Sequence, residues 1–460
     1  MKIKNKKTKF VIISTALILV LSFFFIKEVI GDSGKFRYLK SLLSTQQKQL
    51  ITKYLFAYKI VSQQKINFLQ NEISELSFYK ELYFKENLID IEVIKTENIK
   101  LSNDKILEKY QIINGFYSTI NNKKKKAYPV GYLDFHENSI FILSSRGILA
   151  FKQKLNNQKN FKQIKNNINE FISIEQFKKG DYYSLRDLFI HKNKIFVSFI
   201  DEIKKDCWNT SLIYGDINYK NITFKKLFSA EECVHSKNNI DKEFAGTQSG
   251  ARIVNFDDNN VLLSIGEYRN RYLAQKNDSV NGKIIKINIH NNNYEIISMG
   301  HRNPQGLYFD KDQNFILETE HGPKGGDEIN IIEVDKIDNE KILNYGWAIV
   351  SDGEHYKKSK KKYEKYPLYK SHSKYGFIPP IKSFVPSIGI SQITKIASNK
   401  YVASSMKDKS LYFFELDEEK KLKNLKRVEV YERVRDLNFY DNKLYLFLEG
   451  STSIGVINLN

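Results

Sequence analysis

Four cationic side chains lie beside predicted turns and strands in the second half of the 460-residue chain, namely Arg302, Lys407, Arg433 and Arg435. Arg433 and Arg435 are two residues apart, so on a strand both side chains point to the same side. Like charges on one face need an anion or a route to solvent, and the planar arginine fork suits carboxylates. If the four converge, they predict a site for a compact ligand with several carboxylates. The alternative is that each cation pairs with a neighbouring Asp or Glu.

A loop region rich in glycine and proline surrounds the first of these cations. Residues 300–330 read GHRNPQGLYFDKDQNFILETEHGPKGGDEIN. Glycine and proline fix special backbone angles and bring main-chain carbonyls close to a bound group. Polar side chains on loops between short strands are a common location for function. The alternative is that these residues only shape turns while the charges are solvated.

The elements that must position these residues are short strands joined by tight polar turns. Six hairpins of this kind recur after about residue 130, each with a strand, an Asn/Asp/Lys turn and a second apolar strand. They begin at Tyr132, Leu185, Arg252, Gly306, Gln392 and Arg435. Six such units indicate an all-β, six-bladed β-propeller over residues 86–460. A β-sandwich with insertions is the structural alternative. In a propeller, loops from different blades gather at one end of the central channel, which would bring the four cations together.

The amino end predicts an exported, membrane-anchored protein. Five lysines precede an uncharged run from Phe10 to Ile26, as in a signal anchor with a cytoplasmic amino end. We assign residues 1–31 to a signal anchor or signal peptide, with the propeller in the periplasm. The alternative is secretion after cleavage near Gly31. Residues 32–85 follow a helical pattern without Pro or Gly after Lys35 and are assigned to a stalk or a helix packed on the main domain.

The charge balance does not predict nucleic-acid binding. The formal net charge is +20, but the basic residues are scattered and no nucleic-acid-binding motif accompanies them. The two cysteines, Cys207 and Cys233, could pair in an oxidising compartment or be two buried thiols. Their even number outside the cytoplasm favours a disulfide.

Three phrases of the sequence resemble a known family. GHRNPQGL, EHGPKGGDEIN and NYGW (344–347) are similar to the soluble quinoprotein glucose/sorbosone dehydrogenases, also called aldose sugar dehydrogenases. The resemblance extends over about residues 125–460 and leaves the anchor and the helical segment unmatched. It implies a six-bladed propeller that holds pyrroloquinoline quinone (PQQ), a tricarboxylated ortho-quinone, together with calcium.

The resemblance also implies roles for individual residues. Arg302 and Asn303 would contact the quinone oxygens, while Lys407, Arg433 and Arg435 would contact the carboxylates and the ring edge. The main-chain carbonyls of Gly322 and Pro323 are similar to the calcium ligands of the family. Oxygen donors of this kind suit a hard cation, which would polarise the quinone as a Lewis acid.

The sequence departs from the family at the general base. The family has a His before a Gly-Gly-Arg or Ser-Gly-Arg turn, and Gln248 stands there, in the phrase TQSGAR (247–252). A Gln amide cannot accept the proton of a sugar hydroxyl at neutral pH. The catalytic residue is therefore unknown, with His235, His301 and His321 as substitutes to consider. The early-blade phrase Gly-Gly-Leu-Leu-Asp is also altered, to YSLRD (183–187).

Three functions fit these observations. The leading hypothesis is an exported PQQ- and calcium-dependent dehydrogenase that oxidises an aldose or related alcohol and passes electrons to an acceptor of the respiratory chain. The second is a propeller that binds the quinone or a similar polyanion without turnover, which the missing His favours. The third is a lactonase-like hydrolase that uses calcium alone, against which the cation cluster speaks.

Overall fold

The computed structural model describes residues 64–65, 68–69, 72–73, 75–117, 128–153, 160–179, 183–337, 342–356 and 361–460. The chain divides into two compact units, Met1–Asn71 and Glu72–Asn460, and the second contains all the strands described below. The predicted anchor at residues 10–26 and the cleavage site near Gly31 lie outside the described residues. Within the described ranges, no helix is both long and apolar enough to cross a bilayer.

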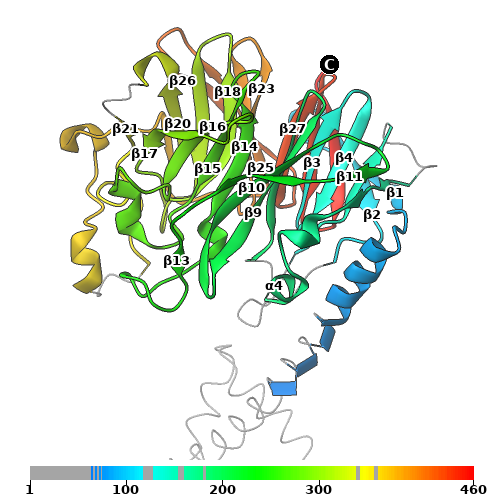
Figure 1. Cartoon of the computed structure of the whole chain (residues 1–460). Coiled ribbons are helices and arrows are strands. Elements are labelled where there is room, and N and C mark those ends of the chain that lie inside the picture. The colour runs from blue at the N-terminus through cyan, green and yellow to red at the C-terminus, as the bar shows by residue number, and fades with distance from the viewer. Residues whose placement is uncertain are drawn as a thin grey trace, which may run out of the picture. The chain divides into compact units, whose positions relative to one another are not determined.

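Six antiparallel sheets form the blades of a β-propeller, as the hairpins predicted (Figure 1). The inner strand of each blade contacts the inner strand of the next, and the sixth contacts the first, which closes the ring. The inner strands of blades 1 to 6 are β3 (Gly131–His136), β8 (Leu185–His191), β14 (Gly250–Asn255), β18 (Pro304–Asp310), β23 (Ile390–Ala397) and β27 (Val434–Tyr440). Every predicted hairpin is the first strand pair of a blade.

The second and third strands of each blade continue outward. The second strands are β4 (Ser139–Ser144), β9 (Lys194–Lys204), β15 (Asn260–Ile265), β19 (Phe315–Glu320), β24 (Lys400–Ser405) and β28 (Lys443–Leu448). The third strands are β5 (Leu149–Lys152), β10 (Cys207–Asp216), β16 (Lys283–Asn288), β20 (Asp327–Glu333), β25 (Ser410–Leu416) and β29 (Ser453–Asn458).

The outer strands are more varied than the inner ones. They are β6 (Lys162–Gln163), β12 (Lys225–Ser229), β17 (Tyr294–Met299), β22 (Lys382–Phe384) and β26 (Leu422–Glu429), with β2 (Ile106–Ile112) in blade 6. Further strands are β1 (Val93–Lys100) beside β2, β13 (Val234–His235) beside β10, β21 (Leu343–Asn344) beside β17, and the pair β7 (Lys165–Asn166) and β11 (Asn221–Ile222).

Short helical segments connect these strands. They are α4 (Ile174–Lys178) and the 3-10 turns η2 (Ile168–Glu170), η4 (Gly246–Gln248), η5 (Arg271–Gln275), η6 (Val334–Lys336), η7 (Lys361–Lys365) and η8 (His372–Tyr375). Residues 75–86 are also helical, in agreement with the end of the predicted helical segment. Phe78 of this helix is buried in the apolar cluster between blades 1 and 2.

Six apolar clusters of the core lie between neighbouring blades, one for each pair, and two smaller clusters lie beside them. Adjacent residues of one strand face different clusters. Ile316 packs between blades 3 and 4, whereas Leu317 packs between blades 4 and 5. Because both faces of a blade are buried, a second strand reads as a continuous apolar run, as in residues 140–143. Full burial of each such side chain contributes about 1.5–3 kcal/mol.

Blade 6 is assembled from both ends of the described chain. The strands β27, β28 and β29 come from its last part, and β2 pairs antiparallel with β29, with Tyr110 opposite Ile454. In Figure 1 the red strands of the carboxyl end accordingly lie beside the cyan strands of the amino end. The ring is therefore closed within a blade by main-chain hydrogen bonds.

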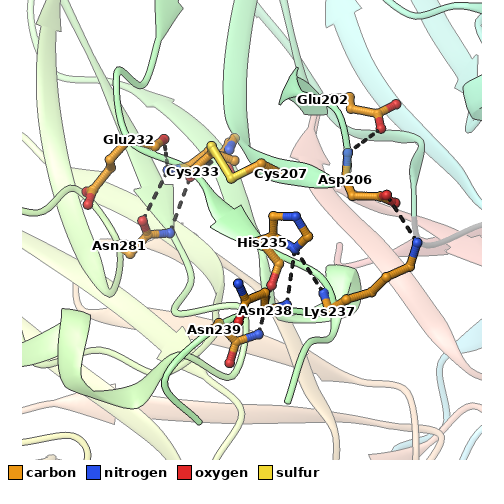
Figure 2. The surroundings of a disulfide bond; sticks show 12 residues. Glu202, Asp206, Cys207, Glu232, Cys233, His235, Lys237, Asn238, Asn239 and Asn281 are labelled. Carbon is orange, nitrogen blue, oxygen red and sulfur yellow. Dashed lines mark hydrogen bonds and ion pairs between the residues drawn. A yellow bond between two sulfur atoms is a disulfide. The ribbon is translucent and has the colours of Figure 1, made fainter. Parts of the chain in front are cut away.

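Cys207 and Cys233 form a disulfide, with their Cα atoms 5.3 Å apart (Figure 2). Of the two states that the sequence allowed, the disulfide is the one found. The bond joins the start of β10 to the segment just before β13. Next to it, Lys237 pairs with Asp206 at 3.1 Å, and the Asp206 peptide N–H donates to Glu202. The disulfide thus fastens the outer edge of blade 2.

Candidate functional site

A cavity of about 530 Å³ lies at the end of the ring where the inner strands begin. Its lining comes from the first residues of the inner strands and from loops between strands at the same end. Because every blade has the same strand order, residues from all six blades meet there. The predicted cofactor and metal residues, and the residue at the expected base position, line this cavity: Gln248, Arg302, Asn303, Gly322, Pro323, Lys407, Arg433 and Arg435.

Arg302 is a buried cation in the wall of the cavity. Its peptide N–H donates to Glu320 Oε2 at 2.5 Å, and its Nη1 donates to the main-chain oxygen of His321 at 2.7 Å. The guanidinium lies 5.3 Å from the centre of the Trp347 ring. No carboxylate of the described residues forms an ion pair with it. Burial lowers the pKa of Arg302, which indicates that nearby anions do not fully offset the cost of burying its charge.

Asn303 has a fixed amide orientation. Its Oδ1 accepts hydrogen bonds from the Gly250 peptide N–H at 3.1 Å and from Gln305 Nε2 at 3.0 Å. Its Nδ2 lies 3.4 Å from His321 Nδ1. The amide nitrogen is therefore the donor that Asn303 can direct toward a bound group.

The other three cations, Lys407, Arg433 and Arg435, have only one carboxylate partner between them within the described part of the chain. Arg433 Nε and Arg435 Nε both donate to the buried carboxylate of Glu449, each at 2.6 Å. Both side chains lie on the same side, as their spacing predicted. Lys407 Nζ donates to the main-chain oxygen of Ser387 at 3.0 Å and has no ion pair with any described carboxylate. The alternative that each cation pairs with a neighbouring Asp or Glu thus holds only in part, because Arg433 and Arg435 share the one carboxylate of Glu449.

Gly322 and Pro323 form a tight turn between β19 and β20. A Cβ atom on Gly322 would lie 1.9 Å from the main-chain oxygen of Gly326, so only glycine fits there. Asp327 holds the turn, because its Oδ1 accepts from the Gly322 peptide N–H at 3.1 Å and its Oδ2 accepts from the Gly389 N–H at 2.6 Å. The carboxylate ties the turn of blade 4 to the start of blade 5.

Gln248 is locked by three charged neighbours. The surrounding hydrogen bonds assign its amide orientation: the nitrogen donates to Glu267 Oε1 at 2.5 Å, and the oxygen accepts from Arg269 Nε at 3.1 Å and Arg302 Nη2 at 2.9 Å. Glu267 is buried, and burial raises its pKa to about 7. Gln248 therefore orients Arg302 and leaves little capacity to accept a proton from a ligand.

Arg252 lines the cavity and links four blades. Its Nε donates to the main-chain oxygen of Gln305 in blade 4 at 3.0 Å. Its Nη1 donates to Asp187 Oδ1 and to Asp436 Oδ1, each at 2.7 Å. Asp187 also accepts from the Ile253 peptide N–H, and Asp436 accepts from the Leu133 N–H, so the network reaches blade 1. Burial raises the pKa of Asp187 to about 7.

Of the three histidines considered as a substitute base, only His321 lines the cavity. Its Nε2 is buried without a hydrogen-bond partner among the described residues, and burial lowers its pKa. His301 is fully buried, stacked on Tyr345, with its Nε2 at 2.9 Å from Ser298 Oγ. His235 lies beside the disulfide, where its Nδ1 accepts main-chain N–H groups (Figure 2). His321 is therefore the one of the three that combines a place in the cavity wall with a ring nitrogen that makes no hydrogen bond within the described structure.

Sequence reasoning missed the roles of Arg186, Arg252 and Glu267. Arg186 lines the cavity and donates to the main-chain oxygen of Gly246 at 3.2 Å. A signal for the Arg252 network was present, because Arg-Asp-Leu occurs in two inner strands, at 186–188 and 435–437, and both aspartates contact Arg252. Glu267 lies in a connection without any pattern, and only packing places it behind Gln248.

Fold and cavity together define a class of protein. It is a six-bladed β-propeller whose channel mouth carries an excess of cations over carboxylates. A model described as glucose / sorbosone dehydrogenase matches residues 182–455. The chain belongs to this family, which confirms the resemblance read from the sequence.

Two curated proteins are similar over parts of the chain. An uncharacterized protein of Synechocystis sp. is 29% identical over 222 residues, which cover 42% of this chain and 51% of that protein. The aldose sugar dehydrogenase YliI of Escherichia coli is 36% identical over 125 residues, 24% of this chain and 32% of that protein. The chain thus spans about half and about a third of the length of these relatives.

Solved structures support the fold. A glucose dehydrogenase crystal structure has a TM-score of 0.56 at 20% identity, covering 71% of this chain and 95% of that one. The apo form of the soluble aldose sugar dehydrogenase from Escherichia coli has a TM-score of 0.55 at 20% identity, with 71% and 94% covered.

Proposed function

We propose that the cavity binds PQQ with calcium and that the chain oxidises an aldose sugar or a related alcohol. The observation that carries this proposal is the excess of cations at the cavity. Arg302 and Lys407 have no carboxylate partner among the described side chains, and Arg433 and Arg435 share Glu449. A ligand with several carboxylates would offset this charge, because charge-assisted hydrogen bonds are strong in a partly buried site.

Each residue would hold a different part of the quinone. Arg302 and the Asn303 amide nitrogen would donate to the quinone oxygens, since both are fixed by their own hydrogen bonds. Lys407, Arg433 and Arg435 would bind the carboxylates and the ring edge. The cavity volume of about 530 Å³ is in the range for a cofactor of this size.

The turn at Gly322 and Pro323 fits a calcium ion. Main-chain carbonyls are ligands that calcium prefers, and Asp327 ties this turn to the start of blade 5. The Pro323 oxygen accepts only a long hydrogen bond, 3.4 Å from Ser387 Oγ, within the described structure. The two carbonyls would hold the ion against the quinone.

When bound, the quinone would supply hydride acceptance from the sugar carbon, with calcium polarising it. The residues of the chain would bind the sugar, orient it and exclude water. The proton of the sugar hydroxyl has no protein base in the expected position, because the Gln248 amide is occupied by Glu267, Arg269 and Arg302. This observation favours a second candidate function, in which the propeller binds the quinone without turnover.

One experiment separates the two functions. The purified chain is titrated with PQQ and calcium while cofactor absorbance is followed, and dye reduction is then measured over a panel of aldoses and alcohols. Gln248→His is expected to raise turnover by about 10²- to 10⁴-fold, the usual contribution of a general base. Bound quinone with no turnover on any substrate would support the binding function and contradict the dehydrogenase.

Matched variants test the cavity itself. Arg435→Ala should weaken quinone binding at least tenfold. Arg427→Ala, which removes an exposed arginine paired with Asp408 outside the cavity, should not change it. If both variants bind the quinone like the wild type, the assignment of the cavity is wrong.

For the location of the protein, we propose the bacterial inner membrane, with the anchor at residues 10–26 and the propeller in the periplasm. Cleavage near Gly31 and secretion is the alternative. The disulfide supports an oxidising compartment. An acceptor in the respiratory chain would then take the electrons. Protease accessibility in spheroplasts tests this location, and a propeller protected from protease until the membrane is lysed would contradict it.

A further inference from the structure

A second cavity, of about 730 Å³, lies between blades 6 and 1. We refer to it as the interblade pocket. Phe135 and Tyr440, near the ends of β3 and β27, line it, as do Asn138 and Asp441 in the hairpin turns that follow. The cationic cavity is lined by the first residues of the same strands. The interblade pocket therefore lies at the opposite end of the ring.

The pocket is open because the two blades differ in width. Blade 6 has five strands, whereas the two outer strands of blade 1, β5 and β6, have four and two residues. Glu108 and Tyr110 of β2 line the pocket beyond the reach of these short strands. The strands β1, β2 and β3 precede residues 182–455, which match the family model. The pocket is thus built partly from segments outside the family match.

One wall of the pocket is a rigid aromatic cluster. The rings of Phe135 and Tyr440 are stacked, with centroids 4.4 Å apart and an interplanar angle of 1°. Tyr445 packs edge-on against Phe135 at 4.6 Å. The Tyr440 hydroxyl donates to the main-chain oxygen of Glu137, which fixes the ring at its other end. A fixed aromatic wall binds the C–H face of a ligand with little entropy loss.

The rim of the pocket is polar and nearly balanced in charge. The side chains of Asn98, Asn138 and Asp441 are exposed and make no hydrogen bond to another described residue. The carboxylates that line the pocket are Asp104, Glu108 and Asp441, and the lysines are Lys105 and Lys443. This near balance favours a neutral ligand over a polyanion, and the amides offer both donors and acceptors.

We propose that the interblade pocket binds a neutral oligosaccharide. A pyranose ring presents an apolar C–H face to an aromatic wall and hydroxyl groups to amides and carboxylates. The volume is within the range of small-molecule sites and would hold a few sugar rings. The proposal does not depend on the redox function, because the pocket shares no residue with the cationic cavity.

The test uses the full-length chain, purified in a detergent without a sugar headgroup. Binding of methyl glycosides of β-glucan, α-glucan, xylan and chitin oligosaccharides is measured by saturation-transfer NMR and calorimetry. The blocked reducing end prevents oxidation at the anomeric carbon. At least one of these neutral oligosaccharides is expected to bind, and Tyr440→Ala should weaken that binding at least tenfold.

A second variant and a control keep the test independent of folding. Asn98→Ala/Asn138→Ala changes only exposed side chains and should also weaken binding at least tenfold. Tyr294→Ala removes an exposed tyrosine that packs edge-on against Phe228 outside the pocket, and should have no effect. The proposal is overturned if none of the four oligosaccharides binds, or if binding persists in the Asn98/Asn138 variant.

Discussion

Replacing Arg252 by methionine tests whether one buried cation holds four blades together. The guanidinium is 6% exposed and bridges two carboxylates, Asp187 and Asp436, that are each 1% exposed. Removing one partner of a buried ion pair costs about 3–5 kcal/mol, because the other charge stays buried without compensation. Here two carboxylates lose their shared cation, so we expect the free energy of unfolding to fall by about 5 kcal/mol at neutral pH.

The loss should depend on pH in a definite direction. Burial raises the pKa of Asp187 to about 7, from an ordinary value of 3.8, even with Arg252 present. The folded state then holds a proton that the unfolded state releases, so the contribution of this group to stability falls as pH rises from about 4 to 7. Without Arg252, Asp187 has no cation to offset its charge and must be protonated to stay buried. The difference in the free energy of unfolding between wild type and Arg252→Met should therefore be smaller at pH 5 than at pH 8.

The assay is urea unfolding of wild type and variant at both pH values. Arg427→Met serves as the control, because Arg427 is 45% exposed and pairs with Asp408 at the surface. Its cost should stay below about 1 kcal/mol at either pH. Equal deficits for Arg252→Met at pH 5 and pH 8 would refute the reasoning, since uncompensated carboxylates could not then be the cause.

Two further predictions concern buried titratable groups, and a third concerns the disulfide. Burial lowers the pKa of Lys283 to about 7, so wild-type stability should rise with pH between about 7 and 10.5 relative to Lys283→Met in denaturant titrations. Burial raises the pKa of Glu267 to about 7, so stability should fall from about pH 4.5 to 7, and Glu267→Gln should remove that slope; an unchanged slope would contradict it. The disulfide between Cys207 and Cys233 joins residues with a sequence separation of 26. Its reduction should lower the free energy of unfolding by about 3 kcal/mol, measured by urea unfolding with and without reductant.

The inner hairpins of the fold could be predicted because their signals are local. A strand such as residues 140–143 is apolar throughout, since both faces of a blade are buried. The outer strands gave no such signal. β26 is largely exposed and rich in lysine, and β6 has only two residues. The pairing of β2 with β29 joins segments more than 340 residues apart, and no pattern within either segment indicates it.

The cations of the site could be predicted from residue type and spacing, but their partners could not. The spacing of Arg433 and Arg435 predicted that both side chains lie on one side of a strand. Their shared partner, Glu449, could not be predicted, because only the packing of the blade brings it to them. The locked amide of Gln248 likewise depends on Glu267 and Arg269, which the sequence offered no reason to select. Hydrogen bonds between buried polar groups that are distant in sequence form only when the ring is assembled, so the pattern of a single segment does not predict them.

The shared construction of blade 6 has a consequence for synthesis. During translation, β1 and β2 emerge before any of the five other blades, yet β2 pairs with β29, which emerges last. Until then β2 has an open edge that could pair with another chain. A nascent propeller would thus depend on chaperones to keep that edge covered. Premature termination before Ser453 would leave this edge open permanently, so truncated chains should aggregate rather than form a five-bladed ring.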